Sequence, residues 1–345
     1  MDFKNKLINW YSIHKRELPW RSTENPYSIW LSEIILQQTQ VKQGLPYYNA
    51  FVKKYPSVFD LARASEEEIL KLWQGLGYYS RARNLHTTAK HIAYDLNGVF
   101  PNNYNALLKL KGVGDYTASA IASIAFNEVA AVVDGNVYRV LARYYGIDTP
   151  INLTAGIKEF KTLASSLIDE QQPATYNQAI MEFGARQCKP KNPDCTTCPL
   201  KDGCVSLQKN LVNVLPIKLK KTKIITKYFN FLVCVDKDKK VLFEKRVGKG
   251  IWQNLYQFPL IESKKSLSVN EFHLLNLENT ALVSNEFDYS LYNETDKVHK
   301  LSHQHLHTKF WIVETETLKN ATINWTEIKK FPVPVLIANF LEEYQ

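Results

Sequence analysis

The sequence has few cysteines and no long apolar segment. Five cysteines among 345 residues are too few for a disulfide scaffold. The first 20 residues are rich in charge and contain Pro19, so they lack the apolar core of a signal peptide. The uncharged stretch Tyr116–Asn127 has only 12 residues, too short to cross a bilayer. We therefore expect a cytoplasmic protein with reduced thiols and no membrane span.

The chain is long and basic. Its 43 Lys and Arg residues outnumber 34 Asp and Glu, which gives a formal net charge of +9 and a pI near 9.1. A polyanion is a common partner for such a protein, although basic proteins without nucleic-acid ligands also exist. With 45% hydrophobic residues, 345 residues can bury two cores. We expect two domains.

The spacing and type of the apolar residues change near residue 215. Before it, apolar residues recur at helical spacing, and Ser65 with Glu68 predicts a capping box. From Tyr228 onward, short β-branched and aromatic runs predict strands. We predict a mainly α N-terminal domain over 1–214, a basic linker over 215–226 and an α+β C-terminal domain over 227–345. The linker lysines fit either a solvated tether or a segment that follows a phosphate backbone.

Four of the cysteines lie close together in the pattern C-x6-C-x2-C-x5-C, and these are Cys188, Cys195, Cys198 and Cys204. They could be plain buried or paired thiols, ligands of a structural zinc, or ligands of an iron–sulfur cluster. Zinc sites usually pair two short knuckles, whereas this segment has one. Four thiolates within 17 residues favour an iron–sulfur cluster. Cys234 lies in an apolar run and fits a core position.

A glycine-containing turn joins two helical patterns, which predicts a helical hairpin over about residues 105–126. Gly112 and Gly114 permit positive φ and a close backbone approach. The amides at the start of the second helix, with the helix dipole, would bind a phosphate of one DNA strand without reading its sequence. Such a turn is a weak signal alone, but Asp134-Gly-Asn136 downstream strengthens it.

Together with the cysteine pattern, these residues resemble the helix-hairpin-helix DNA glycosylases of the endonuclease III superfamily. The segments Leu18–Arg21, Trp30–Val41 and Leu72–His86 are most similar to the MutY adenine DNA glycosylases, and the resemblance covers about residues 7–210. It implies a six-helix barrel with a 4Fe–4S cluster module over 188–204, followed by a Nudix-like domain. In such a protein the cluster is expected to have a structural role, not a catalytic one.

The resemblance assigns the chemistry to two carboxyls. Glu33 corresponds to the general acid that protonates adenine, and Asp134 to the anion that stabilises the sugar cation. From the residues alone, Glu33 either faces solvent or is a desolvated carboxyl with a raised pKa. Asp134 also fits the N-cap of the next helix, and the two roles are compatible. Asn136 is expected to orient the carboxylates.

Position 116 separates two subclasses of the superfamily. Members that also cut the strand have a lysine there, because an amine forms a Schiff base with the opened sugar. Tyr116 cannot form that adduct, so we predict little or no lyase activity. The phenol can instead hydrogen-bond Asp134 or the sugar, or simply pack near the hairpin.

The resemblance also assigns substrate contacts. Arg21 is expected beside the flipped adenine, and Gln178 corresponds to an active-site Gln or Glu of the family. Gln38, Thr39 and Tyr78 are expected around the opposite base, where Leu76, Gly77 and Tyr78 form a wedge-like turn. Without the resemblance, a glutamine-rich helix face is usually solvated and Tyr78 could belong to a core. The expected partner is double-stranded DNA with an adenine opposite 8-oxoguanine or guanine, bound by a monomer.

The C-terminal domain contains two informative segments. Gly248–Pro259 resembles the strand-loop of Nudix folds, but the following residues lack the glutamate-rich helix that binds magnesium, so nucleotide hydrolysis is not expected. Leu301-Ser302-His303 stands where the family has Phe-Ser-His, a loop that recognises 8-oxoguanine. The histidines of this region could alternatively bind a metal or face solvent.

The sequence thus predicts a monofunctional adenine glycosylase of base excision repair. Two alternatives remain open: an endonuclease III-like glycosylase that also cleaves the strand, and a non-catalytic protein that binds damaged DNA.

Overall fold

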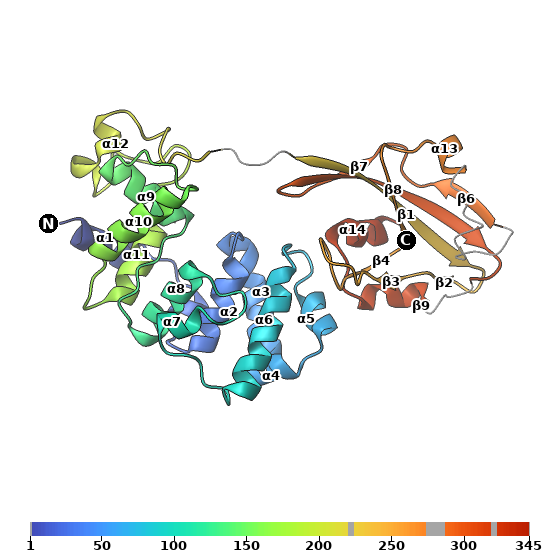
Figure 1. Cartoon of the computed structure of the whole chain (residues 1–345), viewed down its shortest axis with the longest axis horizontal. Coiled ribbons are helices and arrows are strands. Elements are labelled where there is room, and N and C mark those ends of the chain that lie inside the picture. Colours follow the sequence, from blue (N-terminus) through green and yellow to red (C-terminus); the bar gives the residue numbers. More distant parts are fainter. Residues whose placement is uncertain (1, 220–223, 274–286, 319–322, 345) are drawn as a thin grey trace. The chain divides into compact units, whose positions relative to one another are not determined.

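The computed structural model describes residues 2–219, 224–273, 287–318 and 323–344 (Figure 1). The chain forms two compact units. The first comprises Met1–Arg63 and Arg83–Lys220, and the second comprises Ala64–Ala82 and Lys221–Gln345. The division after residue 220 falls within the linker predicted at 215–226, of which residues 220–223 lie outside the described residues. The segment 64–82 clusters with the C-terminal strands rather than with the helices that flank it in sequence.

The first unit is built from helices, as the sequence predicts. Its elements are α1 (Phe3–His14), η1 (Pro19–Arg21), α2 (Pro26–Leu36), α3 (Val41–Lys54), α4 (Val58–Arg63), most of α6 (Ser80–Lys90), η2 (His91–Asp95), α7 (Tyr104–Leu107), α8 (Asp115–Phe126), α9 (Gly135–Tyr145), α10 (Thr154–Leu167), α11 (Pro173–Arg186), η3 (Lys201–Gly203) and α12 (Val205–Gln208). The mainly α class of this part is therefore confirmed.

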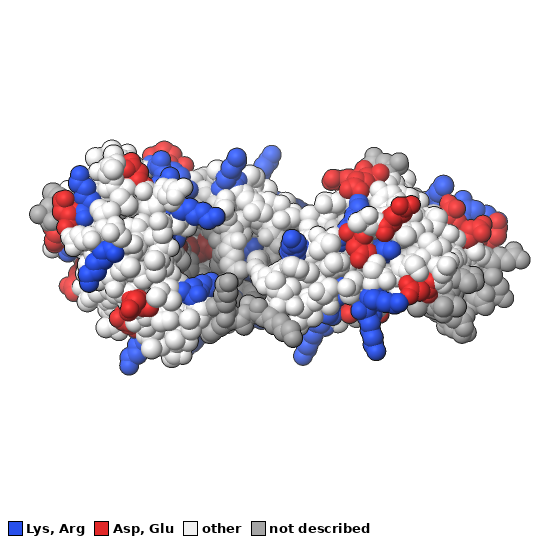
Figure 2. All heavy atoms as spheres, turned by 90° about the horizontal axis from the view of Figure 1, so that it is seen from above, with Lys and Arg blue, Asp and Glu red and all other residues white. Residues whose placement is uncertain are grey.

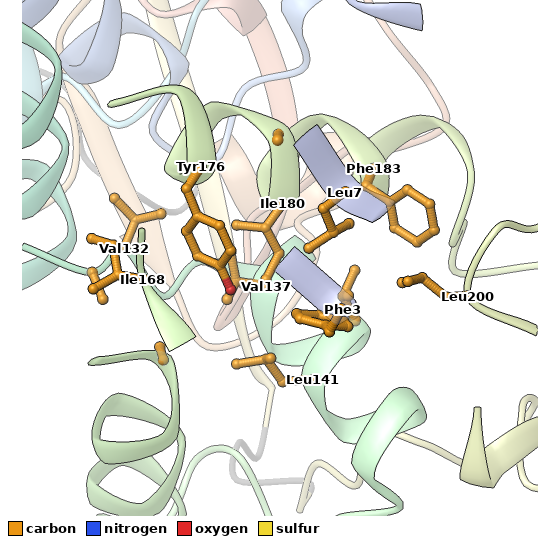
Figure 3. Close-up of a cluster of buried hydrophobic side chains, with 14 of the residues drawn as sticks. Phe3, Leu7, Val132, Val137, Leu141, Ile168, Tyr176, Ile180, Phe183 and Leu200 are labelled. Carbon is orange, nitrogen blue, oxygen red and sulfur yellow. The ribbon is translucent and has the colours of Figure 1, made fainter. Parts of the chain in front are cut away.

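A core of this unit lies where α1, α9 and α11 meet (Figure 3). Phe3 and Leu7 of α1 point towards Val137 and Leu141 of α9, at the helical spacing that the sequence pattern predicts. Phe183 of α11 is only 1% exposed. Each such side chain contributes about 1.5–3 kcal/mol when it is fully buried. These contacts fix α9 and α11, which both supply side chains to the site described below.

The second unit contains a mixed β-sheet. Its elements are α5 (Glu66–Leu72), β1 (Ile225–Asp236), β2 (Lys240–Val241), β3 (Glu244–Lys245), β4 (Tyr256–Gln257), β5 (Leu260–Ser263), α13 (Val269–His273), β6 (Phe287–Leu291), β7 (Lys297–Lys300), β8 (Gln304–Thr315), β9 (Ile323–Asn324), η5 (Trp325–Lys330) and α14 (Val335–Glu343). The described strands of the main sheet follow the order β6-β8-β1-β2-β9, with β5 beside β1 and β7 beside β8.

The long central strands β1 and β8 run parallel, from Ile225 opposite Gln304 to Asp236 opposite Thr315, whereas the other pairs are antiparallel. Both faces of this central pair are covered. On one face Trp311 stacks on Phe272 of α13 with ring centroids 3.8 Å apart. On the other, Phe310 stacks on Phe340 of α14 at 4.2 Å. The α+β class predicted for the C-terminal part is confirmed.

The surface carries charges of both signs. In the view of Figure 2, Lys and Arg side chains project at many points of the surface and are interspersed with Asp and Glu. Over the described ranges, no helix has both the length and the apolar character required of a membrane span.

Candidate active site

A cleft of about 710 Å³ opens in the first unit. Side chains reach it from α2, α8, α11, the start of α9 and the segment around η1. The cleft brings together many of the residues singled out in the sequence, namely Arg21, Glu33, Gln38, Thr39, Tyr116, Asp134, Asn136 and Gln178. These positions are spread over most of the first unit's sequence, and the helical core places them around one space.

Glu33 is a carboxyl buried in the wall of the cleft. It lies on α2, which begins at Pro26 behind the N-cap Asn25, whose side chain accepts from the backbone N–H of Tyr27 at 2.9 Å. Only 7% of Glu33 is exposed. Burial raises its pKa to about 7; the charge of Asp134 raises it as well, while a hydrogen bond with Tyr116 and the charge of Arg21 lower it. Glu33 can therefore hold a proton near neutrality.

Asp134 is the second carboxyl of the cleft, and it is also the N-cap of α9. Its Oδ1 accepts from the backbone N–H groups of Asn136 and Val137, both at 2.8 Å, and its Oδ2 accepts from Nδ2 of Asn136 at 2.7 Å. Burial raises the pKa of Asp134, and these hydrogen bonds oppose that shift. The N–H donors favour the ionised form, so the two carboxyls have environments suited to opposite protonation states.

Tyr116 is the second residue of α8, and it lines the same cleft as the two carboxyls. Its hydroxyl is 3.3 Å from Sδ of Met181 and interacts with the Glu33 carboxyl. Burial raises the pKa of Tyr116 well above its ordinary value, and the charges of Glu33 and Asp134 raise it further. The phenol is therefore neutral. A lysine, Lys42, also lines the cleft, from the exposed start of α3.

A buried ion-pair network supports Arg21. Glu182 on α11 is 1% exposed, and its carboxylate accepts from Nε and Nη2 of Arg16 at 2.7 and 2.6 Å and from Nη2 of Arg21 at 2.8 Å. Burial alone would raise the pKa of Glu182, but the hydrogen bonds and charges of the two arginines lower it to about 2. The sequence analysis missed Glu182. Its spacing of four from Gln178, which places both on one face of α11, is a signal that could have found it.

Two further contacts orient polar side chains of the cleft, and both partners were missed in the sequence. The hydroxyl of Tyr11 donates to Oε1 of Gln178 at 2.8 Å. Arg139 donates to Oδ1 of Asn136 at 2.8 Å, and its Nε donates to the backbone oxygen of Cys188 at 2.7 Å. Arg139 thereby joins the side chain that holds Asp134 to the first residue of the cysteine segment.

The predicted hairpin is present as α7, a turn and α8. Gly112 takes a φ of +81°, and a Cβ there would lie 2.8 Å from Cβ of Asn84, so a glycine is required. Gly114 differs from the expectation: its φ is −96°, and it serves as N-cap because α8 begins at the next residue. The first backbone bond of α8 runs from Ala118 N to Gly114 O at 2.8 Å, so the amides of 115–117 lie ahead of the hydrogen-bonded turn.

The four clustered cysteines line one small apolar cavity of about 30 Å³. Arg143 reaches this cavity and donates to Sγ of Cys188 at 3.4 Å and to the backbone oxygen of Lys189 at 2.8 Å. Among the residues that the structure describes, no group of three or more His, Cys, Asp or Glu side chains is arranged to hold a metal ion. Cys234 is 1% exposed in β1, a core position.

The remaining predicted residues belong to the second unit. The hydroxyls of Tyr78 and Ser302 are 2.5 Å apart, so two residues assigned to the opposite base are in contact. Tyr78 is 49% exposed and has a φ of +47°, whereas Leu76 is 6% exposed. Leu301 is half-buried, and Ser302 and His303 are exposed at the turn between β7 and β8. Tyr78, rather than Leu76, presents its side chain to solvent.

Comparisons with known proteins agree with this arrangement. Residues 31–161 match the HhH-GPD superfamily of base excision DNA repair proteins, and residues 230–343 match the NUDIX domain. Among solved structures, a thermostable thymine-DNA glycosylase is 33% identical with a TM-score of 0.56, over 60% of this chain and 95% of that one. A trapped endonuclease III–DNA intermediate, 23% identical with a TM-score of 0.53 over 60% of this chain and 95% of that one, has the same fold.

Curated relatives extend the match to both units. The chain is 38% identical over 314 residues to the adenine DNA glycosylase of Buchnera aphidicola subsp. Baizongia pistaciae, covering 90% of this chain and 86% of that protein. It is 43% identical over 216 residues to the adenine DNA glycosylase of Homo sapiens, covering 60% and 40%. An identity of this size over most of both chains, with the helical and NUDIX regions in the same molecule, places the protein in the adenine DNA glycosylase family.

Proposed function

We propose that this protein is a monofunctional adenine DNA glycosylase that removes adenine paired with 8-oxoguanine or guanine in double-stranded DNA. The observation that supports this most is the pair of carboxyls in one cleft. Glu33 has a pKa of about 7, whereas Asp134 accepts three hydrogen bonds from N–H donors. Breaking an N-glycosidic bond requires an acid for the leaving base and an anion for the sugar, and these two groups meet those needs.

In the proposed reaction Glu33 donates its proton to a ring nitrogen of the flipped adenine. The C1′–N9 bond then breaks and its electron pair goes to the base, which leaves as neutral adenine. The sugar becomes an oxocarbenium ion, and the Asp134 carboxylate stabilises it electrostatically. Water adds to C1′ and loses a proton to a carboxylate of the cleft, so the product is an intact strand with an abasic site.

Side chains around the two carboxyls would position the base. Gln178, fixed by Tyr11, offers its amide to the adenine edge, and Arg21, fixed by Glu182, lies at the same wall of the cleft. Tyr116 keeps a neutral phenol where a strand-cleaving enzyme would need an amine, which supports base removal with little or no lyase activity. Asn136 holds the Asp134 carboxylate in place.

Recognition of the opposite base is assigned to the second unit. The contact between Tyr78 and Ser302 joins an exposed aromatic ring to the Leu301-Ser302-His303 turn. A ring can stack beside the estranged base, and a hydroxyl and an imidazole can read the changed donor pattern of 8-oxoguanine. Leu301 supplies apolar contact without an aromatic face. In the first unit, Gln38 and Thr39 at the cleft would fill the space left by the flipped nucleotide.

The cysteine segment fits an iron–sulfur cofactor by its donor set. Four soft sulfur donors, Cys188, Cys195, Cys198 and Cys204, face one apolar cavity, and Arg143 places a positive charge beside Cys188. These four thiolates would hold an iron–sulfur cluster at this segment. When bound, the cluster would cross-link the segment 188–204 and thereby hold the Cys188 carbonyl that Arg139 contacts. We further propose that the enzyme acts as a cytoplasmic monomer.

Single-turnover release of adenine tests this function. Duplexes with 8-oxoguanine:A and with G:A are compared side by side for the wild type, Glu33→Gln and Asp134→Asn. We expect release from both duplexes by the wild type and a loss of at least about a thousandfold in each variant. DNA binding without base release would instead indicate a non-catalytic damage-binding protein. Strand cleavage together with a borohydride-trapped adduct of the wild type would indicate the bifunctional class.

A further inference from the structure

An acidic side chain stands at the start of α8, where the hairpin would bind a DNA phosphate. Asp115 is the first residue of this helix, and its side chain is 49% exposed. Its backbone amide and those of Tyr116 and Thr117 precede the first hydrogen-bonded turn and are therefore donors for a phosphate. A carboxylate favours a helix N-terminus, but it also repels a phosphate that approaches the same amides. This end of α8 therefore needs a neighbouring cation.

Lys161 of α10 supplies that cation. Its ammonium lies 2.9 Å from Oδ1 of Asp115, 3.1 Å from Oγ of Ser119 and 2.8 Å from the backbone oxygen of Ala131. The three N–H groups of the ammonium thus have three acceptors, which belong to the start of α8, its second turn and the segment before α9. An ammonium held by three acceptors keeps a fixed position, unlike an exposed lysine in a single surface ion pair.

The first helix of the hairpin joins the same cluster. The hydroxyl of Tyr104 on α7 donates to Oδ1 of Asp115 at 2.5 Å, and the ammonium of Lys161 lies 5.5 Å from the centre of the Tyr104 ring. The hydrogen bond to Asp115 raises the pKa of Tyr104 to about 12, so the phenol remains a donor at neutral pH. The carboxylate of Asp115 therefore connects both helices of the hairpin to α10.

We propose that Lys161 is a positioning residue for DNA binding, which neutralises Asp115 and thereby allows a backbone phosphate to bind the amides at the start of α8. This proposal rests on the proposed function, in which the hairpin holds DNA. Lys161 acts through Asp115 and touches no reacting atom. Its removal should therefore weaken DNA binding while the bond-breaking step in saturated enzyme stays unchanged.

The experiment compares Lys161→Met, Asp115→Asn, the double variant and Lys161→Arg. The probe is a fluorescein-labelled duplex with 2′-fluoro-2′-deoxyadenosine opposite guanine, in which the fluorine resists base loss by destabilising the sugar cation. Its Kd is measured by anisotropy at several salt concentrations. Lys158→Met is the matched control, because Lys158 is an exposed lysine of the same helix. Adenine release from saturated natural G:A duplex is measured for every variant.

We expect Lys161→Met to weaken binding on the order of tenfold at low salt, and Lys158→Met to weaken it by less than about twofold. Asp115→Asn should bind at least as tightly as the wild type and should restore binding in the double variant, whereas Lys161→Arg should keep it. Equal effects of the Lys161 and Lys158 substitutions, or a double variant as weak as Lys161→Met, would overturn the proposal. If the wild type bound the duplex but Lys161→Met did so equally well, only this inference would fail; if the wild type neither bound nor released adenine, the proposed function would fail.

Discussion

Nη2 of Arg139 donates a hydrogen bond of 2.8 Å to Oδ1 of Asn136. The same amide donates through its Nδ2 to Asp134 at 2.7 Å. The arginine therefore fixes the orientation of the amide, so that its N–H group and not its oxygen faces the carboxylate. Arg139 is held in turn by the backbone oxygens of Gly184 at 2.6 Å and Cys188 at 2.7 Å. The orientation of the Asp134 carboxylate thus depends on a chain of hydrogen bonds that ends at the cysteine segment.

We predict that Arg139→Met slows adenine release by about ten- to a hundredfold in saturated enzyme, because Asn136 loses the partner that orients it. The Kd for the duplex with 2′-fluoro-2′-deoxyadenosine should change little, because the substitution misplaces the catalytic carboxylate and leaves the DNA-binding surface intact. Arg63→Met is the control: it removes a comparable side chain from a surface ion pair. Asn136→Ala, which leaves the carbonyl contacts of Arg139 in place, should be slow as well. A fast Asn136→Ala would contradict this account of Asp134.

The pH dependence of the wild type should follow Glu33. A general acid acts in its protonated form, and burial raises the pKa of Glu33 to about 7. The single-turnover rate in saturated enzyme should therefore fall as the pH rises through about 7, tenfold per pH unit beyond it. Measurement between about pH 6 and pH 9 tests this. A rate that stays constant to about pH 9 would exclude Glu33 as the acid.

The same shift affects stability. Since the folded pKa of about 7 exceeds the ordinary glutamate value of 4.5, the folded state holds the proton more tightly than the unfolded state. This contribution is fully present below about pH 4.5 and is lost as the pH rises to about 7, which amounts to at most about 3 kcal/mol. Glu33→Gln avoids that loss. The free energy of unfolding of Glu33→Gln, measured in urea, should therefore rise relative to that of wild type between about pH 5 and pH 8. The exposed Glu24→Gln should show no such trend.

Tyr116 permits a gain-of-function test. Wild-type protein should give no covalent adduct with abasic DNA in the presence of borohydride, because a phenol cannot form a Schiff base. Tyr116→Lys places an amine on α8 beside Glu33 and Asp134, so it should give a trapped adduct. Lys42 also lines the cleft. Each protein is therefore also tested with Lys42→Met. A wild-type adduct that persists in Lys42→Met would contradict the assignment of Tyr116.

Local signals in the sequence were sufficient for several features of the structure. The sequence leaves Glu33 either on a solvent-facing helix surface or as a desolvated carboxyl, and the structure shows it buried with a raised pKa. Asp134 before a helical pattern predicted an N-cap, and Ser65 with Glu68 predicted a capping box; both are present. Each of these depends on residues within a few positions along the chain, where helix geometry alone fixes the contact.

Contacts between distant residues could not be predicted in this way. Tyr11 and Gln178 are 167 positions apart, and Arg16 and Glu182 are 166 apart. The grouping of 64–82 with the C-terminal strands is similar, since Glu67 accepts hydrogen bonds from Lys245 and Tyr256, both at 2.9 Å. These pairs arise from tertiary packing, and a single sequence contains no local pattern that reports them. A local motif can also be insufficient. The glycine turn did not indicate that Gly112, and not Gly114, takes the left-handed conformation.

Glu182 provides a test of a contact that the sequence did not reveal. Its folded pKa of about 2 lies below the ordinary glutamate value of 4.5, because two arginines donate to a carboxylate that is 1% exposed. A depressed pKa stabilises the folded state above about pH 4.5, and this contribution is lost as the pH falls towards 2. It amounts to at most about 3 kcal/mol. Wild type should therefore lose stability between about pH 5 and pH 3 more steeply than Glu182→Gln.

At neutral pH the full contribution of Glu182 is present in wild type, whereas Glu182→Gln leaves Arg16 and Arg21 without their buried anion. The variant should be less stable than wild type by about 3 kcal/mol, and adenine release should slow because Arg21 loses its fixed position. Urea unfolding at about pH 7 and pH 3, with single-turnover release at about pH 7, separates the two effects. The exposed Glu327→Gln, which removes one partner of a surface pair with Lys330, is the control. Equal stability of Glu182→Gln and wild type at neutral pH would show that the network does not stabilise this wall of the cleft.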